Sequence, residues 1–188
     1  IGTSLKHYCA NNTERDRLWS SSNVDKRTLN ELYLYPFELA TKAEPTTVMS
    51  SYNKLNGVHT SQNSYITNIL RNRFGFKGVY VSDWDACHDR SKALLATCDV
   101  DMPYAEISYK NLKEGLNSGE ITEANVDESC QRICNLLNWV QDNEPKRVMT
   151  TDKDGRHQVA KEGALEGAVL LKNDGILPMA EGKSIAVF

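Results

Sequence analysis

The sequence predicts an α/β fold built on a parallel sheet. Short runs of β-branched and apolar residues alternate with longer segments whose apolar residues recur every three or four positions. Several of the short runs end in polar residues, as expected for strands that stop at the edge of a sheet. This alternation is the βαβ rhythm of a parallel sheet whose faces are covered by helices.

The first elements follow from this rhythm in order. Residues 1–5 and 46–50 are short runs that we expect to form strands. Between them, residues 25–43 carry apolar side chains at spacings of three and four, which predicts an amphipathic helix with a kink at Pro36.

A second helix and a third strand come next. Asn63 is expected to cap a helix whose apolar positions are Ile66, Ile69, Leu70 and Phe74. Gly75 and Gly78 then interrupt the helical pattern. The apolar run at 79–82 follows at once and predicts a strand.

The pattern continues through the middle of the chain. Residues 89–97 should be helical, residues 98–102 should form a short strand closed by Pro103, and residues 106–117 should be helical again. A turn is expected at Ser118-Gly119.

Residues 122–141 have the clearest helical pattern in the chain, with Thr122 as a plausible cap. One stripe of this helix is expected to be apolar, and it consists of Val126, Cys130, Ile133, Leu137 and Val140. The opposite face should meet water, and it consists of Glu123, Asp127, Glu128 and Arg132.

Residues 142–155 are polar and include Pro145 and Gly155, which is typical of a linker. Past them, residues 159–171 resume a helical or apolar pattern, and residues 185–188 read as a buried strand.

We therefore expect one domain over residues 1–141, a linker over 142–157 and the opening of a second, incomplete domain over 158–188. Because the chain begins at Ile1 within an expected strand, we also expect its natural N-terminus to lie upstream.

Composition excludes several classes of function. The formal net charge is -3, and the basic residues are scattered among acidic ones, so we expect no nucleic-acid partner and no anionic lipid surface. No run reaches the roughly 18 apolar residues of a membrane helix, so we expect no membrane span. The oligomeric state is left open.

The five cysteines favour a reducing compartment. They form no CxxC pair and no zinc-like spacing with histidine, and an odd, dispersed set is typical of reduced core thiols. This leans towards a cytoplasmic location.

Asp83 is the first candidate for chemistry. It stands at the end of the expected strand 79–82 and is followed by Trp84, at the kind of sheet edge where clefts and catalytic groups collect. Two further polar groups, Lys6-His7 and Ser51-Tyr52-Asn53, follow or close the expected strands 1–5 and 46–50.

Five segments, in this order, resemble glycoside hydrolase family 3, on the β-glucosidase side of that family. They are Lys6-His7-Tyr8 with Asn11-Asn12 and Arg17; Met49 to Asn53 with Leu55-Asn56-Gly57; Gly75 to Gly78 leading into Ser82-Asp83-Trp84; Asp99 to Pro103; and Gly167 to Pro178.

This resemblance implies the C-terminal half of a (β/α)8 TIM-type barrel, then a linker and the start of an αβα sandwich. It also implies a retaining, exo-acting β-glucosidase that releases terminal β-D-glucose from glucosides or short oligosaccharides without a cofactor. Asp83 would be the nucleophile. The acid/base Glu would lie outside this chain, so the 188 residues alone should hydrolyse little.

The resemblance also implies a sugar-binding set around Asp83. Lys6 and His7 match a pair that hydrogen-bonds sugar hydroxyls, and Arg17 matches another basic residue of that pocket. Tyr52 matches a tyrosine beside the nucleophile, and Trp84 matches an aromatic wall. Met49 is a further lining residue, although a Met at a strand end is more often core filler.

Three alternatives remain open. Trp84 favours a glucoside, but a β-xylosidase or an enzyme with both activities is the near alternative. A barrel that binds sugar and does no chemistry is the alternative from another class. A metal site at Asp85, His88 and Asp89 is a third interpretation, and His88 and Asp89 also fit the start of the next helix. The family branch that hydrolyses N-acetylglucosaminides carries a Gly-rich loop after Lys-His, and here Tyr8-Cys9-Ala10 follows instead.

Overall fold

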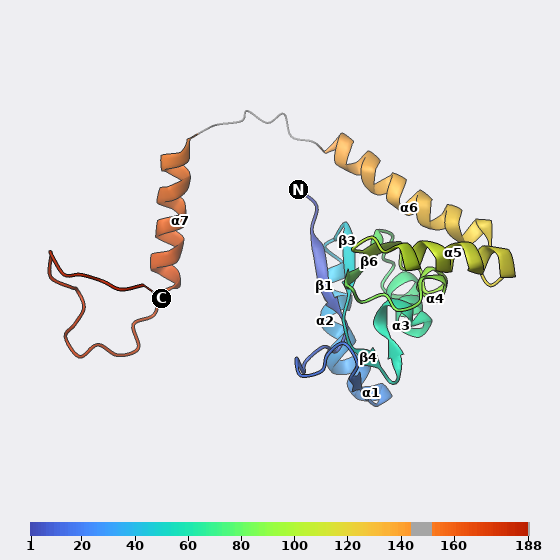
Figure 1. The fold of residues 1–188 in the computed structure, drawn as a ribbon, viewed down its shortest axis with the longest axis horizontal. Coiled ribbons are helices and arrows are strands. Elements are labelled where there is room, and N and C mark those ends of the chain that lie inside the picture. Colours follow the sequence, from blue (N-terminus) through green and yellow to red (C-terminus); the bar gives the residue numbers. More distant parts are fainter. Residues whose placement is uncertain (144–151, 188) are drawn as a thin grey trace. The chain divides into compact units, whose positions relative to one another are not determined.

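The computed structural model describes residues 1–143 and 152–187. The chain divides into two compact units, Ile1–Pro145 and Lys146–Phe188 (Figure 1). Each unit is described by itself.

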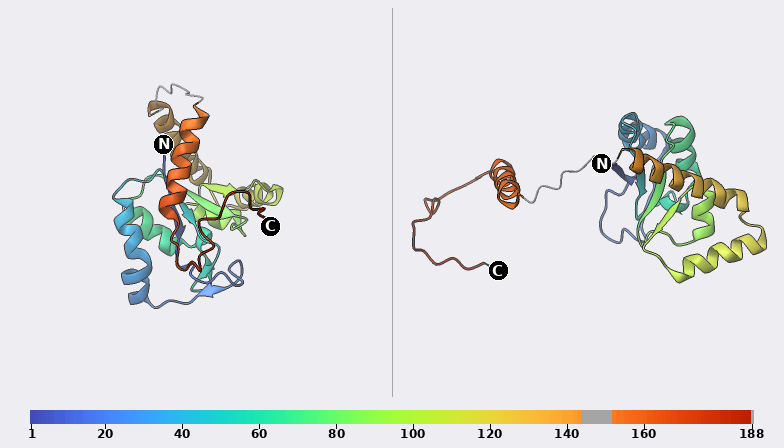
Figure 2. Two further views of the ribbon diagram at one scale, coloured as in Figure 1. Left: turned by 90° about the vertical axis from the view of Figure 1, so that its left-hand side faces the viewer. Right: turned by 90° about the horizontal axis from the view of Figure 1, so that it is seen from above.

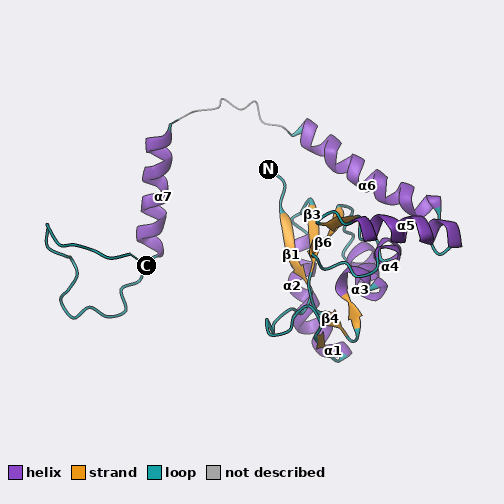
Figure 3. Cartoon of the chain, in the orientation of Figure 1, coloured by secondary structure: helices purple, strands orange, loops and turns teal. Residues whose placement is uncertain are grey.

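The first unit is built on a parallel sheet, as the alternation of elements predicts. Its strands are β1 (Ser4–Tyr8), β3 (Thr47–Ser50), β6 (Val79–Trp84) and β7 (Val100–Met102), in the order β1-β3-β6-β7. All three pairings are parallel, so the carboxyl ends of the strands lie at one edge (Figure 3).

Helices connect these strands. The segments α1 (Lys26–Thr28), η1 (Leu29–Leu34) and α2 (Tyr35–Thr41) lead from β1 to β3, and η2 (Thr60–Gln62), α3 (Ser64–Asn68) and η3 (Ile69–Arg73) lead from β3 to β6. Helix α4 (Arg90–Leu95) joins β6 to β7. Helices α5 (Glu106–Ser118) and α6 (Glu123–Asp142) follow and both pack against α4 (Figures 1 and 2).

Two predicted boundaries are wrong for identifiable reasons. The first strand covers Ser4–Tyr8 rather than 1–5, because Leu5 and Tyr8 pair with Val48 and Ser50 of β3. Lys6 and His7 therefore lie within the strand rather than after it. The helix expected at 25–43 is interrupted by the π-helical turn η1, which ends just before Pro36 in the first turn of α2.

A small second sheet was not predicted. Strands β2 (Ser21–Ser22), β4 (Lys54–Leu55) and β5 (Val58–His59) form it, with β4 and β5 as an antiparallel hairpin. The turn between them is Asn56-Gly57, and both residues have positive φ, 50° and 89°. Asn-Gly is a strong signal for a two-residue hairpin turn, so the sequence did contain the clue.

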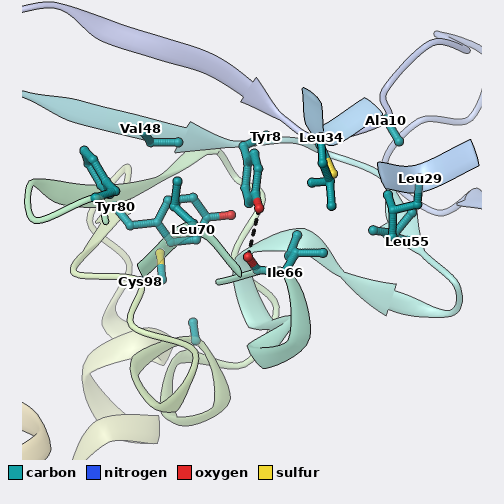
Figure 4. Packing of buried hydrophobic residues seen from close by; sticks show 13 residues of the cluster. Tyr8, Ala10, Leu29, Leu34, Val48, Leu55, Ile66, Leu70, Tyr80 and Cys98 are labelled. Atoms are coloured by element: carbon teal, nitrogen blue, oxygen red, sulfur yellow. Dashed lines mark hydrogen bonds between the residues drawn. The ribbon is translucent and has the colours of Figure 1, made fainter. Parts of the chain in front are cut away.

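The core fills the space between the main sheet and its helices. Tyr8 and Tyr80 are fully buried, and their rings meet edge to face at 6.3 Å (Figure 4). The Tyr8 hydroxyl donates a 2.8 Å hydrogen bond to the Ile66 carbonyl, which satisfies the buried phenol. Burial raises the pKa of both phenols, so they stay neutral.

A buried ionic cluster ties α6 to the sheet. Asp99, just before β7, is paired with Arg71 at 3.1 Å and with Arg132 at 2.8 Å, and it also accepts the Tyr80 amide. Arg132 therefore points inward, which contradicts the expectation that it faces water. The helix is turned so that Ser129 and Arg132 are covered, because the buried carboxylate needs its cations.

That rotation of α6 also changes the surroundings of two thiols. Cys130, expected on the apolar stripe, and Cys134 are exposed, whereas Cys9 and Cys98 are buried as predicted for core thiols. All five cysteines are free.

In the second unit, helix α7 spans Lys153–Gly167, so part of the segment expected as linker is helical. The side chain of Asp152 caps it by accepting from the Gly155 amide at 2.8 Å. Residues 185–187, expected in a buried strand, are exposed and irregular, and Phe188 lies outside the described residues. The described part of this unit holds no strand that could pair with them.

In the described ranges, no helix is both long and apolar enough to cross a membrane.

Candidate active site

Three strands bring polar side chains together at the carboxyl edge of the main sheet. His7 comes from β1, Ser50 ends β3, and Asp83 lies near the end of β6. Because neighbouring parallel strands end at the same edge, residues far apart in sequence become neighbours there. His7 Nε2 lies 3.2 Å from Asp83 Oδ2, so these two side chains are in contact.

Asp83 is buried, and its two carboxylate oxygens differ. Oδ1 accepts a 2.7 Å hydrogen bond from the Trp84 amide, and the amide of Asp83 itself donates to the Ser50 hydroxyl at 3.2 Å. Oδ2 is buried and meets no well-aligned donor within the described residues, although His7 Nε2 approaches it to 3.2 Å and the Tyr52 hydroxyl donates towards the same carboxylate. A buried carboxylate oxygen without a well-aligned donor is costly, which makes Asp83 a candidate functional residue.

Tyr52 and Arg17 form one flank of this carboxylate. The Arg17 guanidinium lies over the Tyr52 ring, 4.3 Å from its centroid, in a cation–π contact. Arg17 also pairs with Glu14 on the exposed side of its loop. Burial, and next the negative charge of Asp83, raise the pKa of the Tyr52 phenol, so it stays a neutral donor beside the acid.

The other predicted site residues are not all in contact with Asp83. Trp84 follows it in β6 with a largely exposed indole, 56% by area. Met49 is half-buried on β3, where it pairs with Val81 of β6. Lys6 is exposed next to His7 and makes no hydrogen bond or ion pair with any residue that the structure describes.

A stack of three aromatic rings next to this site was missed by the sequence reasoning. The ring centroids of His59 and His88 are 3.9 Å apart, and those of His88 and Trp19 are 5.5 Å apart. His59 belongs to the Asn-Gly hairpin that was not predicted, so no sequence pattern brought it near His88.

Both imidazoles of this stack are held neutral. Burial, and then the neighbouring His88, lower the pKa of His59 to about 4, while a hydrogen bond with the Tyr52 backbone opposes the shift. Burial also lowers the pKa of His88. Nδ1 of His59 is buried and lacks a hydrogen bond within the described residues.

The metal interpretation of Asp85, His88 and Asp89 gains no geometric support. Asp89 caps α4 by accepting from the Lys92 amide, and its other oxygen pairs with Lys92 Nζ at 2.7 Å. His88 is stacked between two rings. No group of three or more His, Cys, Asp or Glu suited to a metal occurs within the described residues.

Comparison with known proteins identifies relatives for most of the chain. Residues 1–136 match the family model described as glycosyl hydrolase family 3 N terminal domain. An exo-α-(1→6)-L-arabinopyranosidase of Bifidobacterium breve is 40% identical over 97% of this chain and 24% of its own length. A thermostable β-glucosidase B of Acetivibrio thermocellus is 39% identical over 100% of this chain and 25% of its own length. The chain thus spans about a quarter of the curated relatives it matches.

Solved structures of β-glucosidases also match nearly all of this chain, at similar sequence identity. A GH3 β-glucosidase of Bifidobacterium adolescentis is 39% identical with a TM-score of 0.79, over 96% of this chain and 27% of that one. The β-glucosidase 3B of Thermotoga neapolitana in complex with glucose is 34% identical with a TM-score of 0.79, over the same shares.

Proposed function

The chain belongs to glycosyl hydrolase family 3, and on that premise we propose that the protein it comes from is a retaining, exo-acting β-glucosidase. Its substrates are β-glucosides or short oligosaccharides with a non-reducing terminal β-D-glucose. Relatives described as β-glucosidases support this choice.

The observation on which the proposal rests is the state of Asp83. Its Oδ2 is buried without a well-aligned donor from the described residues, and Asp83 lies near the end of β6, at the edge where β1, β3 and β6 end. A retaining glycosidase needs a carboxylate oxygen that is free to attack the anomeric carbon. The bond from the Trp84 amide to Oδ1 holds the carboxylate in one orientation without occupying the attacking oxygen.

The neighbours of Asp83 suit a sugar. His7 and Arg17 supply donors for hydroxyl oxygens, and the neutral Tyr52 phenol donates without adding charge. We assign Lys6 to the same set, since its exposed ammonium pairs with none of the described residues and can donate to a hydroxyl. Trp84 offers an exposed indole for the apolar side of the ring, and we assign the half-buried Met49 of β3 to the lining of the same pocket.

The reaction is a double displacement. Asp83 Oδ2 forms a bond to the anomeric carbon while the glycosidic bond breaks, and the departing oxygen receives a proton from a carboxylic acid. The product is a glycosyl ester of Asp83. Water, deprotonated by the same acid/base group, then breaks that ester and restores the carboxylate. We assign the acid/base group to a Glu outside these 188 residues.

The order of the strands also supports a proposal about the architecture. We infer that the first unit is the C-terminal half of a (β/α)8 barrel and that the second unit begins an αβα sandwich. The parallel order β1-β3-β6-β7 with intervening helices supports the first part, because barrel active sites lie at the carboxyl ends of the strands.

Mechanism-based labelling tests the nucleophile. The full-length protein is treated with a 2-deoxy-2-fluoro-β-glucoside, and the labelled peptide is mapped by mass spectrometry. Label is expected on Asp83, and Asp83→Asn should lower kcat by at least about 10³-fold because it removes the attacking group. Asp85→Asn, two residues away and exposed, is the matched control and should retain activity. Label on any other residue would refute the assignment.

The arabinopyranosidase relative makes a second activity worth measuring. A panel of 4-nitrophenyl β-D-glucoside, β-D-xyloside and α-L-arabinopyranoside gives the order of kcat/KM. The proposal predicts the glucoside first. A higher value for either of the other two would shift the assignment to that glycoside, and binding of sugars without any turnover would indicate a barrel that does no chemistry.

A further inference from the structure

Trp19 is an exposed aromatic ring on a fixed support. Its indole is 67% exposed, and one side of it meets His88 at 5.5 Å with the rings inclined by 45°. His88 in turn stacks on His59 at 3.9 Å and 33°. Single exposed apolar side chains are common on protein surfaces, so what distinguishes Trp19 is the pair of stacked imidazoles that supports it.

The support under Trp19 is held by buried hydrogen bonds. The Ser61 hydroxyl donates to the Ala86 carbonyl at 2.8 Å, and the Gln62 amide donates to the Asp89 carbonyl at 3.1 Å. These two bonds fasten the loop that carries His88 to the segment just after His59. The two imidazoles that support the indole therefore lie on segments joined to each other, which lowers the conformational cost of binding a ligand on this stack.

Trp19 is connected to Asp83 in two ways, through its own loop and through the loop that carries His88. Two residues earlier in the same loop, Arg17 lies over the Tyr52 ring. The negative charge of Asp83 contributes to the raised pKa of that phenol. His88 stands five residues after Asp83 in the loop that leaves β6. The contact between Trp19 and His88 thus joins the loop that follows β1 to the loop that follows β6, and this pair of residues is called the rim below.

We propose that Trp19, supported by His88 and His59, binds the leaving group of the glycoside. The ligand class is a flat apolar ring, either an aryl aglycone or the C–H face of a second pyranose. Aromatic side chains stack favourably on such faces. This inference rests on the proposed function and deepens it, because Trp84 lies next to the nucleophile and Trp19 lies at the rim.

Selectivity between leaving groups tests the inference in the full-length protein. Trp19→Ala, Trp19→Phe and wild type are compared by kcat/KM on phenyl β-glucoside and on methyl β-glucoside, which differ only in the leaving group. The ratio of the two values should fall about tenfold in Trp19→Ala, because only the phenyl ring loses its stacking partner. Trp19→Phe should restore most of the ratio.

The matched control is Trp139→Ala. Trp139 is also partly exposed, but it lies beside Thr46 and Gly78, at the amino ends of β3 and β6. Its removal should leave the ratio unchanged. An equal fall for both substrates in Trp19→Ala, or an unchanged ratio, would overturn the inference.

A binding measurement separates this inference from the proposed function. The dissociation constants of phenyl and methyl 1-thio-β-glucosides, which resist hydrolysis, are measured by calorimetry. Trp19→Ala should weaken only the phenyl ligand, about tenfold. If wild type binds both ligands but hydrolyses neither glucoside, the proposed function fails while the ratio of dissociation constants still decides the role of Trp19. If wild type binds neither ligand, both proposals are refuted.

Discussion

Replacing Asp99 with Asn should destabilise the first unit more than any exposed charge mutation. The Asp99 side chain is fully buried between two guanidinium groups, Arg71 at 3.1 Å and Arg132 at 2.8 Å, and it also accepts the amide of Tyr80. Asn has the same shape but no charge, so Asp99→Asn removes the buried counter-ion of both guanidinium groups, and Arg132 keeps only its 3.7 Å pair with the exposed Glu128. The NH2 group of Asn also cannot accept from the donors around it.

The size of the effect follows from this burial. Breaking a buried ion pair by removing one partner costs about 3–5 kcal/mol, because the remaining charge stays desolvated. With a urea dependence of about 2 kcal/mol per molar, the unfolding midpoint should fall by about 1.5–2.5 M. The pairs bridge η3 and α6 to the segment before β7, so the loss should loosen the packing of α6.

Urea unfolding of the full-length protein, followed by far-ultraviolet circular dichroism, measures the shift. Glu38→Gln is the control, because its 3.3 Å pair with Arg73 is about 40% exposed on both sides and should contribute about 0–1 kcal/mol. If Asp99→Asn and Glu38→Gln shift the midpoint equally, the cluster does not stabilise the fold and the reasoning is refuted.

Two further outcomes follow from the packing. Burial lowers the pKa of His59 from its usual 6.5 to about 4 in the folded protein, so the unfolded chain binds more protons between these values. Stability therefore falls as the pH drops through that window. After a discount for partial exposure, wild type should lose about 1–2 kcal/mol more than His59→Asn between pH 7 and 4.5 in thermal unfolding, and equal losses would contradict the shift. Gly78→Ala should cost about 1–3 kcal/mol by the same measurement, since a Cβ would overlap the Thr46 carbonyl oxygen, and an unchanged melting temperature would show that the backbone yields.

Local patterns were sufficient for most of the elements. The runs at 46–50 and 79–82 formed strands within two residues of their predicted bounds, and Thr122 caps α6 as expected, since its hydroxyl accepts from the Asn125 amide. These features depend on neighbours in sequence. The orientation of α6 was missed because Arg132 pairs with the carboxylate of Asp99, 33 positions away in the sequence. The spacing of apolar residues within the helix contains no information about that partner.

In the candidate site, too, some residues could be predicted from local sequence patterns and others could not. Asp83 was visible as an acid closing a buried strand, and its contact with His7 follows once parallel strands share an edge. The stack of Trp19, His88 and His59 was not visible, because it depends on an Asn-Gly hairpin and on two loops meeting in space.

The sequence alone determined the α/β alternation, the order of the polar groups and the family resemblance, because periodicity and motif order are properties of the chain. Only the tertiary structure decided that Asp83 Oδ2 is buried 3.2 Å from His7 Nε2, that Arg17 covers Tyr52 and that Arg132 turns inward. Each of these depends on contacts between residues far apart in the chain, which burial and strand pairing select and local pattern does not encode.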